Sequence, residues 1–452
     1  MVFKDMKGMF QQMEKVKVVK FGGSSLADAE HFRMVERIVM AEPERRYVVP
    51  SAPGKRFPGD TKVTDMLYEC YNMASQGENI DEAFARIIER YELVISGLGI
   101  DLDLSGEFAT IKASFALHAG RDYAASRGEY LNGLILAKLL DFDFIDAAGV
   151  VCFADDGSFD DETTDKILHA ELKKHYRAVI PGFYGSMPNG TIKTFSRGGS
   201  DITGSIVARA ARATLYENWT DVSGFLMADP RIIDSPKGID NITYHELREL
   251  SYMGATVLHE DSIFPVRAAK IPINIRNTNE PTAKGTMIVP NGTDIADEKN
   301  VITGVAGRRG FSVLNIEKAH MNAEIGFGRR VLEAIENEGI TFEHLPSGID
   351  TMSVVLSGDV TSEQRSRIMN AICASCLPEY IGFEDGLALV AVVGRGMVNN
   401  KGTAARVFSA VAKAGINIRM IDQGSSEISI ILGVDDKDFE KTLKSIYGEF
   451  VK

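Results

Sequence analysis

The C-terminal third of the chain contains an internal repeat, and this repeat constrains the fold more than any other feature of the sequence. The segment VLEAIENEGI at residues 331–340 corresponds to VFSAVAKAGI at residues 407–416. The same register continues downstream, where Gly348 corresponds to Gly424. Each copy has the pattern of a βαββαβ unit of roughly 70 residues, and this is the ferredoxin-like pattern.

The N-terminal part of the chain alternates between strand and helix patterns. The β-forming residues at 16–21 end at Gly22-Gly23-Ser24-Ser25, apolar residues at helical spacing follow over 26–39, and a second strand is predicted at 47–49. This order predicts a parallel sheet. The polar stretch at 290–299 is the predicted linker to the repeat. Further helices are predicted at 81–95, 129–140 and 201–213, and further strands at 144–146, 149–151, 178–183, 271–275 and 287–289.

The charge and cysteine content exclude several classes of protein. The chain has 452 residues, of which 63 are acidic and 50 are Lys or Arg, so its formal net charge is −13. This charge disfavours nucleic acid and anionic membranes as partners, and an anionic substrate requires a local cluster of basic residues. Four cysteines indicate a reducing compartment rather than a disulfide framework. Since we find neither a signal-peptide pattern nor an apolar run of about 18 residues, we expect a cytoplasmic protein without a membrane partner.

Two glycine-rich segments are candidates for anion binding. KFGGSS at residues 20–25 ends the first strand, where glycines let the backbone approach phosphate oxygens and a lysine adds positive charge. SRGGSD at residues 196–201 precedes a predicted helix, whose N-terminus favours anions. Together they indicate one cleft at the carboxyl edge of the sheet. An ordinary turn or helix cap remains an alternative for each of them and for the polar loop at residues 220–231.

The order of these motifs resembles that of the aspartate kinases in the amino acid kinase superfamily. The family's KFGGTS-like motif corresponds to residues 20–25, its GRGGSD motif to residues 196–201, and its TDVxG…DPR loop to residues 220–231. Gly128-Glu129 and the segment from Ser51-Ala52 to Thr64 match two further motifs. The paired repeats look like two ACT domains, which are small-molecule sensors.

This resemblance implies an α/β fold with an αβα sandwich around a mainly parallel sheet, at residues 14–295. ACT domain 1 would comprise residues 311–385, and ACT domain 2 would comprise residues 300–310 and 386–452, because the first is inserted into the second in the family. The strand near 301–305 is then expected to pair within 386–452. Since no length remains for a fused homoserine dehydrogenase, we expect a monofunctional enzyme.

The resemblance also implies the reaction and the roles of individual residues. ATP and L-aspartate would give 4-phospho-L-aspartate and ADP, the first step towards lysine, threonine and methionine. Lys20 would stabilise charge on the transferred phosphoryl group, and Asp201 would orient Lys20. Arg197 would hold a carboxylate of aspartate and Glu129 its amino group, together with Thr64, Phe183 and Ser200. The ATP site, with Mg²⁺ bridging the phosphates and no cluster of protein metal ligands, would comprise Gly22, Gly23, Ser25, Thr220, Asp221 and Arg231.

The ACT pair implies feedback inhibition by an end-product amino acid, and monofunctional relatives of this length favour L-lysine. A homodimer or homotetramer through the ACT domains is expected. The candidate effector contacts are Met321, Glu324, Gly326, Phe327, Glu343 and Asp350.

The sequence departs from the family at one position of the nucleotide site, where Thr256 replaces a lysine.

Two other functions stay open. One is an amino acid kinase with another acceptor, such as glutamate. The other is a catalytically inactive ACT-type amino-acid sensor, and the retention of Lys20, Asp201 and Arg197 argues against it.

Overall fold

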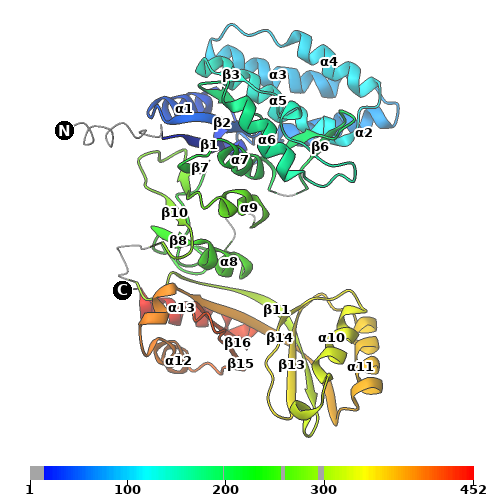
Figure 1. Cartoon of the computed structure of the whole chain (residues 1–452), viewed down its shortest axis with the longest axis vertical. Coiled ribbons are helices and arrows are strands. Elements are labelled where there is room, and N and C mark those ends of the chain that lie inside the picture. The colour runs from blue at the N-terminus through cyan, green and yellow to red at the C-terminus, as the bar shows by residue number, and fades with distance from the viewer. Residues whose placement is uncertain (1–14, 197, 256–259, 294–299, 452) are drawn as a thin grey trace, which may run out of the picture. The chain divides into compact units, whose positions relative to one another are not determined.

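The computed structural model describes residues 15–196, 198–255, 260–293 and 300–451 (Figure 1). Among these residues, no helix is both long and apolar enough to cross a membrane. The chain divides into two compact units. The first unit comprises Met1–Phe225, Asp240–Tyr244 and Val257–Thr293, and the second comprises Leu226–Ile239, His245–Thr256 and Asp294–Lys452.

The first unit is built on an eight-stranded sheet with the strand order β3-β4-β2-β1-β7-β9-β10-β8. Neighbouring strands are parallel, except that β9 and β10 are antiparallel. The predicted mainly parallel sheet is therefore confirmed. Its strands are β1 (Lys17–Phe21), β2 (Arg45–Pro50), β3 (Asp143–Phe144), β4 (Ala178–Val179), β7 (Leu215–Thr220), β8 (Asn241–Thr243), β9 (Ile273–Asn277) and β10 (Thr286–Val289), and a separate hairpin comprises β5 (Tyr184–Ser186) and β6 (Ile192–Thr194).

Helices cover both faces of this sheet (Figure 1). Val19 and Phe21 of β1 pack in one apolar core with the first five helices. Because side chains alternate along a strand, Val18 and Lys20 point to the opposite face, where α7 lies against β1. The helices of the first face are α1 (Ala29–Met40), α2 (Val63–Ser75), α3 (Asp81–Leu98), α4 (Ser105–Ala116) and α5 (Arg121–Leu140). Those of the second face are α7 (Gly199–Ala210) and its neighbours α6 (Asp161–Leu172) and α9 (Glu260–Ala268).

The second unit contains a six-stranded antiparallel sheet with the order β12-β13-β11-β14-β16-β15. Its strands are β11 (Gly304–Glu317), β12 (Phe342–His344), β13 (Thr351–Ser357), β14 (Tyr380–Val393), β15 (Met420–Asp422) and β16 (Ser429–Asp435). Its helices are α10 (Phe327–Glu336), α11 (Ser362–Cys376), α12 (Thr403–Lys413) and α13 (Phe439–Phe450), together with α8 (Tyr244–Tyr252) from its second residue onward.

The strands β11 and β14 run through both repeats. Gly304–Arg308 pairs with Leu389–Val393, and Phe311–Glu317 pairs with Tyr380–Leu387; the register shifts between Arg308 and Phe311 and again between Phe311 and Val313. The expected pairing of the strand near 301–305 with the C-terminal segment is confirmed, because Val305 lies opposite Val392. The helices α10 and α11 share an apolar core with the Phe311–Glu317 half, and α13 packs on the other half. The boundaries of the two ACT domains stay a prediction.

Candidate active site

A buried lysine at the carboxyl end of β1 pairs with the first turn of α7. The Nζ atom of Lys20 lies 2.6 Å from Oδ1 of Asp201, and the lysine side chain is 9% exposed. The same Oδ1 accepts a hydrogen bond of 2.8 Å from Nδ2 of Asn218. Asn218 lies opposite Lys20 in the pairing of β1 with β7. The strand register therefore places the ammonium and the amide side by side, and the first turn of α7 brings the carboxylate to both of them.

The glycine loop after β1 packs backbone to backbone against the turn after β2. The N–H of Gly54 donates to the carbonyl of Gly23 at 2.8 Å, and the N–H of Gly22 donates to the carbonyl of Trp219 at 3.0 Å. A Cβ atom on Gly23 would lie 2.8 Å from the carbonyl oxygen of Ala52, and one on Gly54 would lie 2.6 Å from the carbonyl carbon of Gly23. Glycine is therefore required at both positions by this close approach.

The N-terminus of α7 packs on the segment that follows β4. A Cβ atom on Gly182 would collide with the Cβ of Ser200, so these two residues are in direct contact. The N–H of Phe183 donates to Oγ1 of Thr203 at 2.9 Å, and Phe183 has a positive φ of 80°. Two of the predicted aspartate-binding residues, Phe183 and Ser200, thus lie together at a helix N-terminus, which favours anions.

Glu129 of α5 is a buried carboxyl group with one oxygen left without a partner. The residue is 6% exposed, and its Oε2 accepts no hydrogen bond among the described residues. Burial raises the pKa of Glu129 to about 8, although the backbone N–H of Ala52 and the charges of Arg127 and Lys20 act in the opposite direction. A cationic group of a ligand would satisfy this acceptor.

The remaining predicted residues of the first unit are more dispersed. Thr64 is half-buried in the first turn of α2. Ser25 is buried, and its Oγ lies 2.7 Å from Oγ1 of Thr278, so this hydroxyl already has a partner within the protein. Thr220 ends β7 and donates to the carboxylate of the exposed Asp221 at 3.1 Å.

Three predicted positions cannot be placed in this arrangement. Arg231 belongs to the second unit, where its exposed guanidinium pairs with Asp229 at 2.6 Å. Arg197 and Thr256 lie outside the described residues.

Sequence reasoning did not find Asn218 and Thr278. Asn218 is 2% exposed and Thr278 is 1% exposed, and each bonds to a predicted site residue. For Asn218 the sequence offers one signal, which is the polar pair Glu217-Asn218 within the strand that ends at Thr220; it offers none for Thr278.

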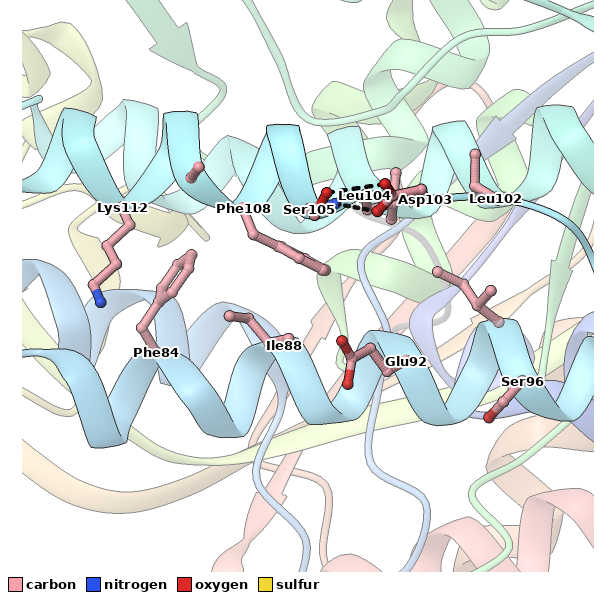
Figure 2. Close-up of a pocket in the computed structure, with 12 residues that line it drawn as sticks. Phe84, Ile88, Glu92, Ser96, Leu102, Asp103, Leu104, Ser105, Phe108 and Lys112 are labelled. Atoms are coloured by element: carbon pink, nitrogen blue, oxygen red, sulfur yellow. Dashed lines mark hydrogen bonds between the residues drawn. The ribbon is translucent and has the colours of Figure 1, made fainter.

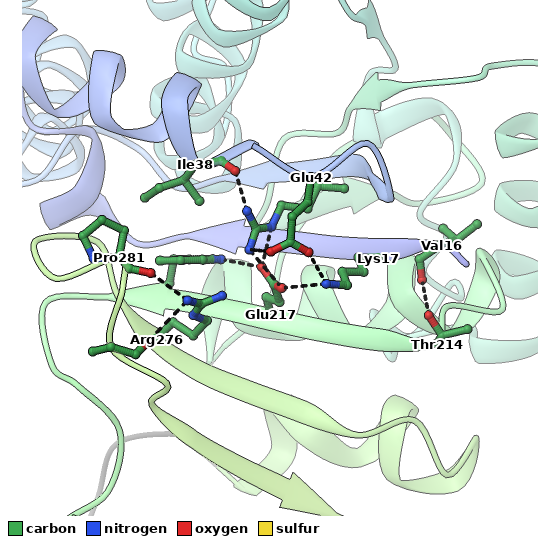
Figure 3. Close-up of polar contacts among 11 residues, drawn as sticks. Val16, Lys17, Ile38, Glu42, Thr214, Glu217, Arg276 and Pro281 are labelled. Atoms are coloured by element: carbon green, nitrogen blue, oxygen red, sulfur yellow. Dashed lines mark hydrogen bonds and ion pairs between the residues drawn. The ribbon is translucent and has the colours of Figure 1, made fainter. Parts of the chain in front are cut away.

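A buried ion-pair network joins β1, β2 and β7 on the face opposite Lys20 (Figure 3). Arg45 donates to both carboxylate oxygens of Glu217 at 2.8 and 3.2 Å, and these side chains are 3% and 1% exposed. Glu42 pairs with Arg45 at 2.7 Å, and Lys17 lies 3.6 Å from Glu217. The indole N–H of Trp219 donates to Glu217 at 2.9 Å. The network thus fixes the strands that carry Lys20 and Asn218.

A cavity of about 590 Å³ opens elsewhere in the first unit, between α3 and α4 (Figure 2). Apolar side chains such as Phe84, Ile88, Leu104 and Phe108 line it, and Lys112 stands at its side. None of the predicted site residues lines this cavity, so it is separate from the candidate active site.

The predicted effector residues lie in the second unit. Glu324 pairs with Lys318 at 2.5 Å and also with Arg330. Asp350 accepts a hydrogen bond of 2.7 Å from the N–H of His320. Glu343 lies on β12 and accepts a hydrogen bond from the hydroxyl of Tyr252. Met321 and Gly326 lie in the segment that leads into α10, and Phe327 is the first residue of that helix.

Comparison with known proteins defines the class. The amino acid kinase family matches residues 15–277, which is more than half of the chain, and an ACT domain matches residues 390–450. The crystal structure of Clostridium acetobutylicum aspartate kinase, described as an allosteric enzyme, is 50% identical with a TM-score of 0.88, and the match covers 96% of this chain and 100% of that chain. This chain belongs to the amino acid kinase family.

Within that family, the relatives point to one branch. Aspartokinase 3 of Bacillus subtilis (strain 168) is 37% identical over 96% of this chain and 98% of its own length. The structure of E. coli aspartokinase III in complex with lysine and aspartate is 25% identical with a TM-score of 0.69, covering 97% of this chain and all of that one. The match to a bifunctional aspartokinase/homoserine dehydrogenase of Haemophilus influenzae covers 54% of that relative. The resemblance to aspartate kinases with C-terminal ACT domains is therefore confirmed.

Proposed function

We propose that the protein transfers the γ-phosphoryl group of ATP to the β-carboxylate of L-aspartate, giving 4-phospho-L-aspartate and ADP. The observation that carries this proposal is the pair of Lys20 and Asp201 at 2.6 Å, next to the glycine loop at the carboxyl edge of a parallel sheet. The E. coli relative bound to aspartate supports the choice of acceptor.

The chemistry requires positioning and charge stabilisation rather than a base. A carboxylate acceptor is already ionised at pH 7, so no proton has to be removed from it. In our proposal, Lys20 neutralises charge that develops on the transferred phosphoryl group, and Asp201 together with Asn218 fixes its ammonium. In the same proposal, the backbone around Gly22 and Gly23 lies close to the phosphates, which is possible because neither residue carries a side chain.

Aspartate carries two carboxylates and one ammonium, and the proposed site offers a group for each charge. Glu129, with its unpartnered Oε2, takes the ammonium. Arg197 holds a carboxylate, and Ser200 at the start of α7 supplies a helix N-terminus beside it. Phe183 and Thr64 border the same substrate.

The nucleotide site is proposed to comprise Gly22, Gly23, Ser25, Thr220 and Asp221 of the first unit, whereas the sixth predicted residue, Arg231, belongs to the second unit. Within the described residues, no group of three or more His, Cys, Asp or Glu side chains is placed to hold a metal ion. A Mg²⁺ ion that arrives with ATP is part of the proposal, and it would neutralise phosphate charge. A cytoplasmic location is part of the same proposal.

We propose that the ACT region makes the enzyme sensitive to an end-product amino acid, and that this amino acid is L-lysine. The lysine-bound E. coli relative supports this choice. The candidate contacts are Met321, Glu324, Gly326, Phe327, Glu343 and Asp350. Inhibition then requires two conformational states that bind lysine with different affinities. Assembly as a homodimer or homotetramer through the ACT domains belongs to this proposal.

The test is ADP release by the full chain from Mg-ATP, with L-aspartate or L-glutamate as acceptor, in the presence and absence of L-lysine or L-threonine. We expect turnover that depends on aspartate and is suppressed by lysine. Turnover with glutamate instead would replace the acceptor, and activity that lysine leaves unchanged would overturn the proposed effector. No turnover with either acceptor, combined with lysine binding in calorimetry, would favour an inactive sensor.

The state of Glu129 predicts how aspartate binding depends on pH. With a pKa of about 8, the carboxyl group is mostly protonated at pH 7 and becomes the carboxylate that pairs with ammonium as the pH rises. KM for aspartate is therefore expected to fall roughly five- to tenfold between pH 7 and pH 8.5, in steady-state assays at saturating ATP. Glu129→Gln, an isostere of the neutral form, should have a high KM that does not change with pH. A wild-type KM that stays constant or rises over this range would contradict the assignment.

A further inference from the structure

A buried arginine outside all the recognised motifs anchors the turn that connects the two halves of the proposed site. We call residues 51–54, which follow β2, the β2 turn. Arg90 of α3 is 4% exposed, and its Nη2 donates to the carbonyl of Gly54 at 2.8 Å and to that of Ala27 at 3.0 Å. Its Nη1 lies 2.6 Å from the carboxylate of Asp60, whose side chain is 9% exposed. One guanidinium thus joins three segments of the chain, through two backbone carbonyls and one side-chain carboxylate.

The β2 turn contacts the glycine loop on one side. The N–H of Gly54 donates to the carbonyl of Gly23, and the backbones of these residues are in van der Waals contact. Any movement of Gly54 therefore displaces the loop that is proposed to approach the phosphates.

The same turn contacts α5 on its other side. A Cβ atom on Gly128 would lie 2.7 Å from the Cβ of Ala52, so the turn rests directly on the residue before Glu129. The N–H of Ala52 stabilises the ionised form of Glu129. Asn132, one helical turn further, donates from Nδ2 to the carbonyl of Ser51 at 2.7 Å.

Asp60 makes the ionic contact to Arg90 and also binds Arg56. Its carboxylate accepts hydrogen bonds from the N–H of Arg56 at 2.9 Å and from Nε of Arg56 at 2.8 Å, in addition to the pair with Arg90. The segment between the β2 turn and α2 is therefore attached to α3 through one buried carboxylate.

We infer that Arg90 is a positioning residue, which fixes the β2 turn and through it both the glycine loop and Glu129. The inference rests on the proposed function, since it assigns to Arg90 the geometry of that site. Arg90 itself contacts no reacting group. A guanidinium is suited to this role because its rigid fork donates to two carbonyls and a carboxylate at once, which a lysine ammonium cannot reproduce in the same plane.

The test compares Arg90→Lys and Asp60→Ala in the full-length protein with a matched control, Arg86→Lys. Arg86 lies one turn earlier on α3 and pairs with Glu69 at 2.6 Å, but both side chains are about half exposed. For Arg90→Lys we expect kcat/KM for aspartate to fall roughly tenfold or more, because small displacements of positioning groups have effects of this size. Asp60→Ala should act in the same direction, and Arg86→Lys should match the wild type.

The pH profile separates positioning from support of the fold. When the N–H of Ala52 moves away, the carboxylate of Glu129 loses a donor, so the pH dependence of kcat/KM for aspartate should shift to higher pH in both test variants. Within the part of the chain that the structure describes, the other charged or titratable groups that act on Glu129 include Lys20, Arg127, Tyr68 and Tyr91, and these substitutions leave them in place.

The kinetics and pH profiles of the two variants decide whether Arg90 is a positioning residue. Wild-type kinetics and pH profile in both folded variants would overturn it, even if their melting temperatures were lower. If Arg90→Lys did not fold, Asp60→Ala would decide alone. A wild type that does not phosphorylate aspartate would overturn the proposed function and this inference with it, whereas an active wild type with unaffected variants would overturn only the inference.

Discussion

Replacing Lys20 by methionine is expected to lower kcat roughly 10³-fold, because a cation at the transferred phosphoryl group supplies an effect of this order. Lys20 is buried and fixed by Asp201 at 2.6 Å, so its ammonium is already oriented before the substrates bind. Methionine retains most of the volume of the lysine stem and removes only the charge. The measurement is steady-state ADP release with saturating aspartate and ATP.

Lys17 provides the matched control for this prediction. It lies on the same strand, but its ammonium pairs with Glu42 and lies 3.6 Å from Glu217, on the face opposite Lys20. Lys17→Met should keep kcat within about threefold of the wild type, since a substitution away from the site leaves the transition state unchanged. If Lys20→Met retained more than a tenth of the wild-type kcat, Lys20 would not have the proposed catalytic role.

Replacing Arg45 by methionine is expected to lower the free energy of unfolding by about 3–5 kcal/mol, because it leaves a buried carboxylate without its main partner. Glu217 is 1% exposed and accepts both of its short charged hydrogen bonds from Arg45. Lys17 and Trp219 remain near Glu217, so we expect the lower part of this range. The measurement is urea unfolding followed by circular dichroism.

Two comparisons identify the cause of that loss. In Arg45→Met with Glu217→Leu, both charges are gone, and much of the stability should return because the desolvation of an unpaired carboxylate is removed. Arg86→Met breaks an exposed pair with Glu69 in the same unit and should change the free energy of unfolding by less than about 1 kcal/mol. A loss of less than about 1 kcal/mol in Arg45→Met would show that water compensates Glu217 despite its burial.

The parts of the fold that depend on local pattern could be predicted from the sequence. The glycine loop follows a strand, and the 201–213 pattern corresponds to α7, because glycines and apolar spacing act within a few residues. The expected strand at 149–151 was wrong. Gly149 ends a 3-10 turn that starts at Ala147, where the carboxylate of Asp146 accepts from the N–H of Ala148 at 3.0 Å. A side-chain cap thus outweighed β-propensity there.

The parts that depend on tertiary register could not be predicted. Asn218 lies beside Lys20 because β1 and β7 pair in one register, and it meets Asp201 because α7 packs on these strands; no local signal encodes either arrangement. The sequence motif identified Glu129 as a site residue. It could not show that the carboxyl group is buried, because this burial results from the packing of α5 with other helices, and the burial raises the pKa of Glu129. Arg90 belongs to no motif, because its role depends on carbonyl groups far from it in the sequence.

The position of Trp219 has a consequence for experiments. It is the only tryptophan in the chain, and its buried ring lies between the guanidinium groups of Arg45, at 5.3 Å, and Arg276, at 4.4 Å, all within the first unit. Intrinsic tryptophan fluorescence therefore reports on the unfolding of the first unit alone, whereas far-ultraviolet circular dichroism reports on both. Coincident transitions would show that the units unfold together, and separate ones would resolve two stabilities without any added label.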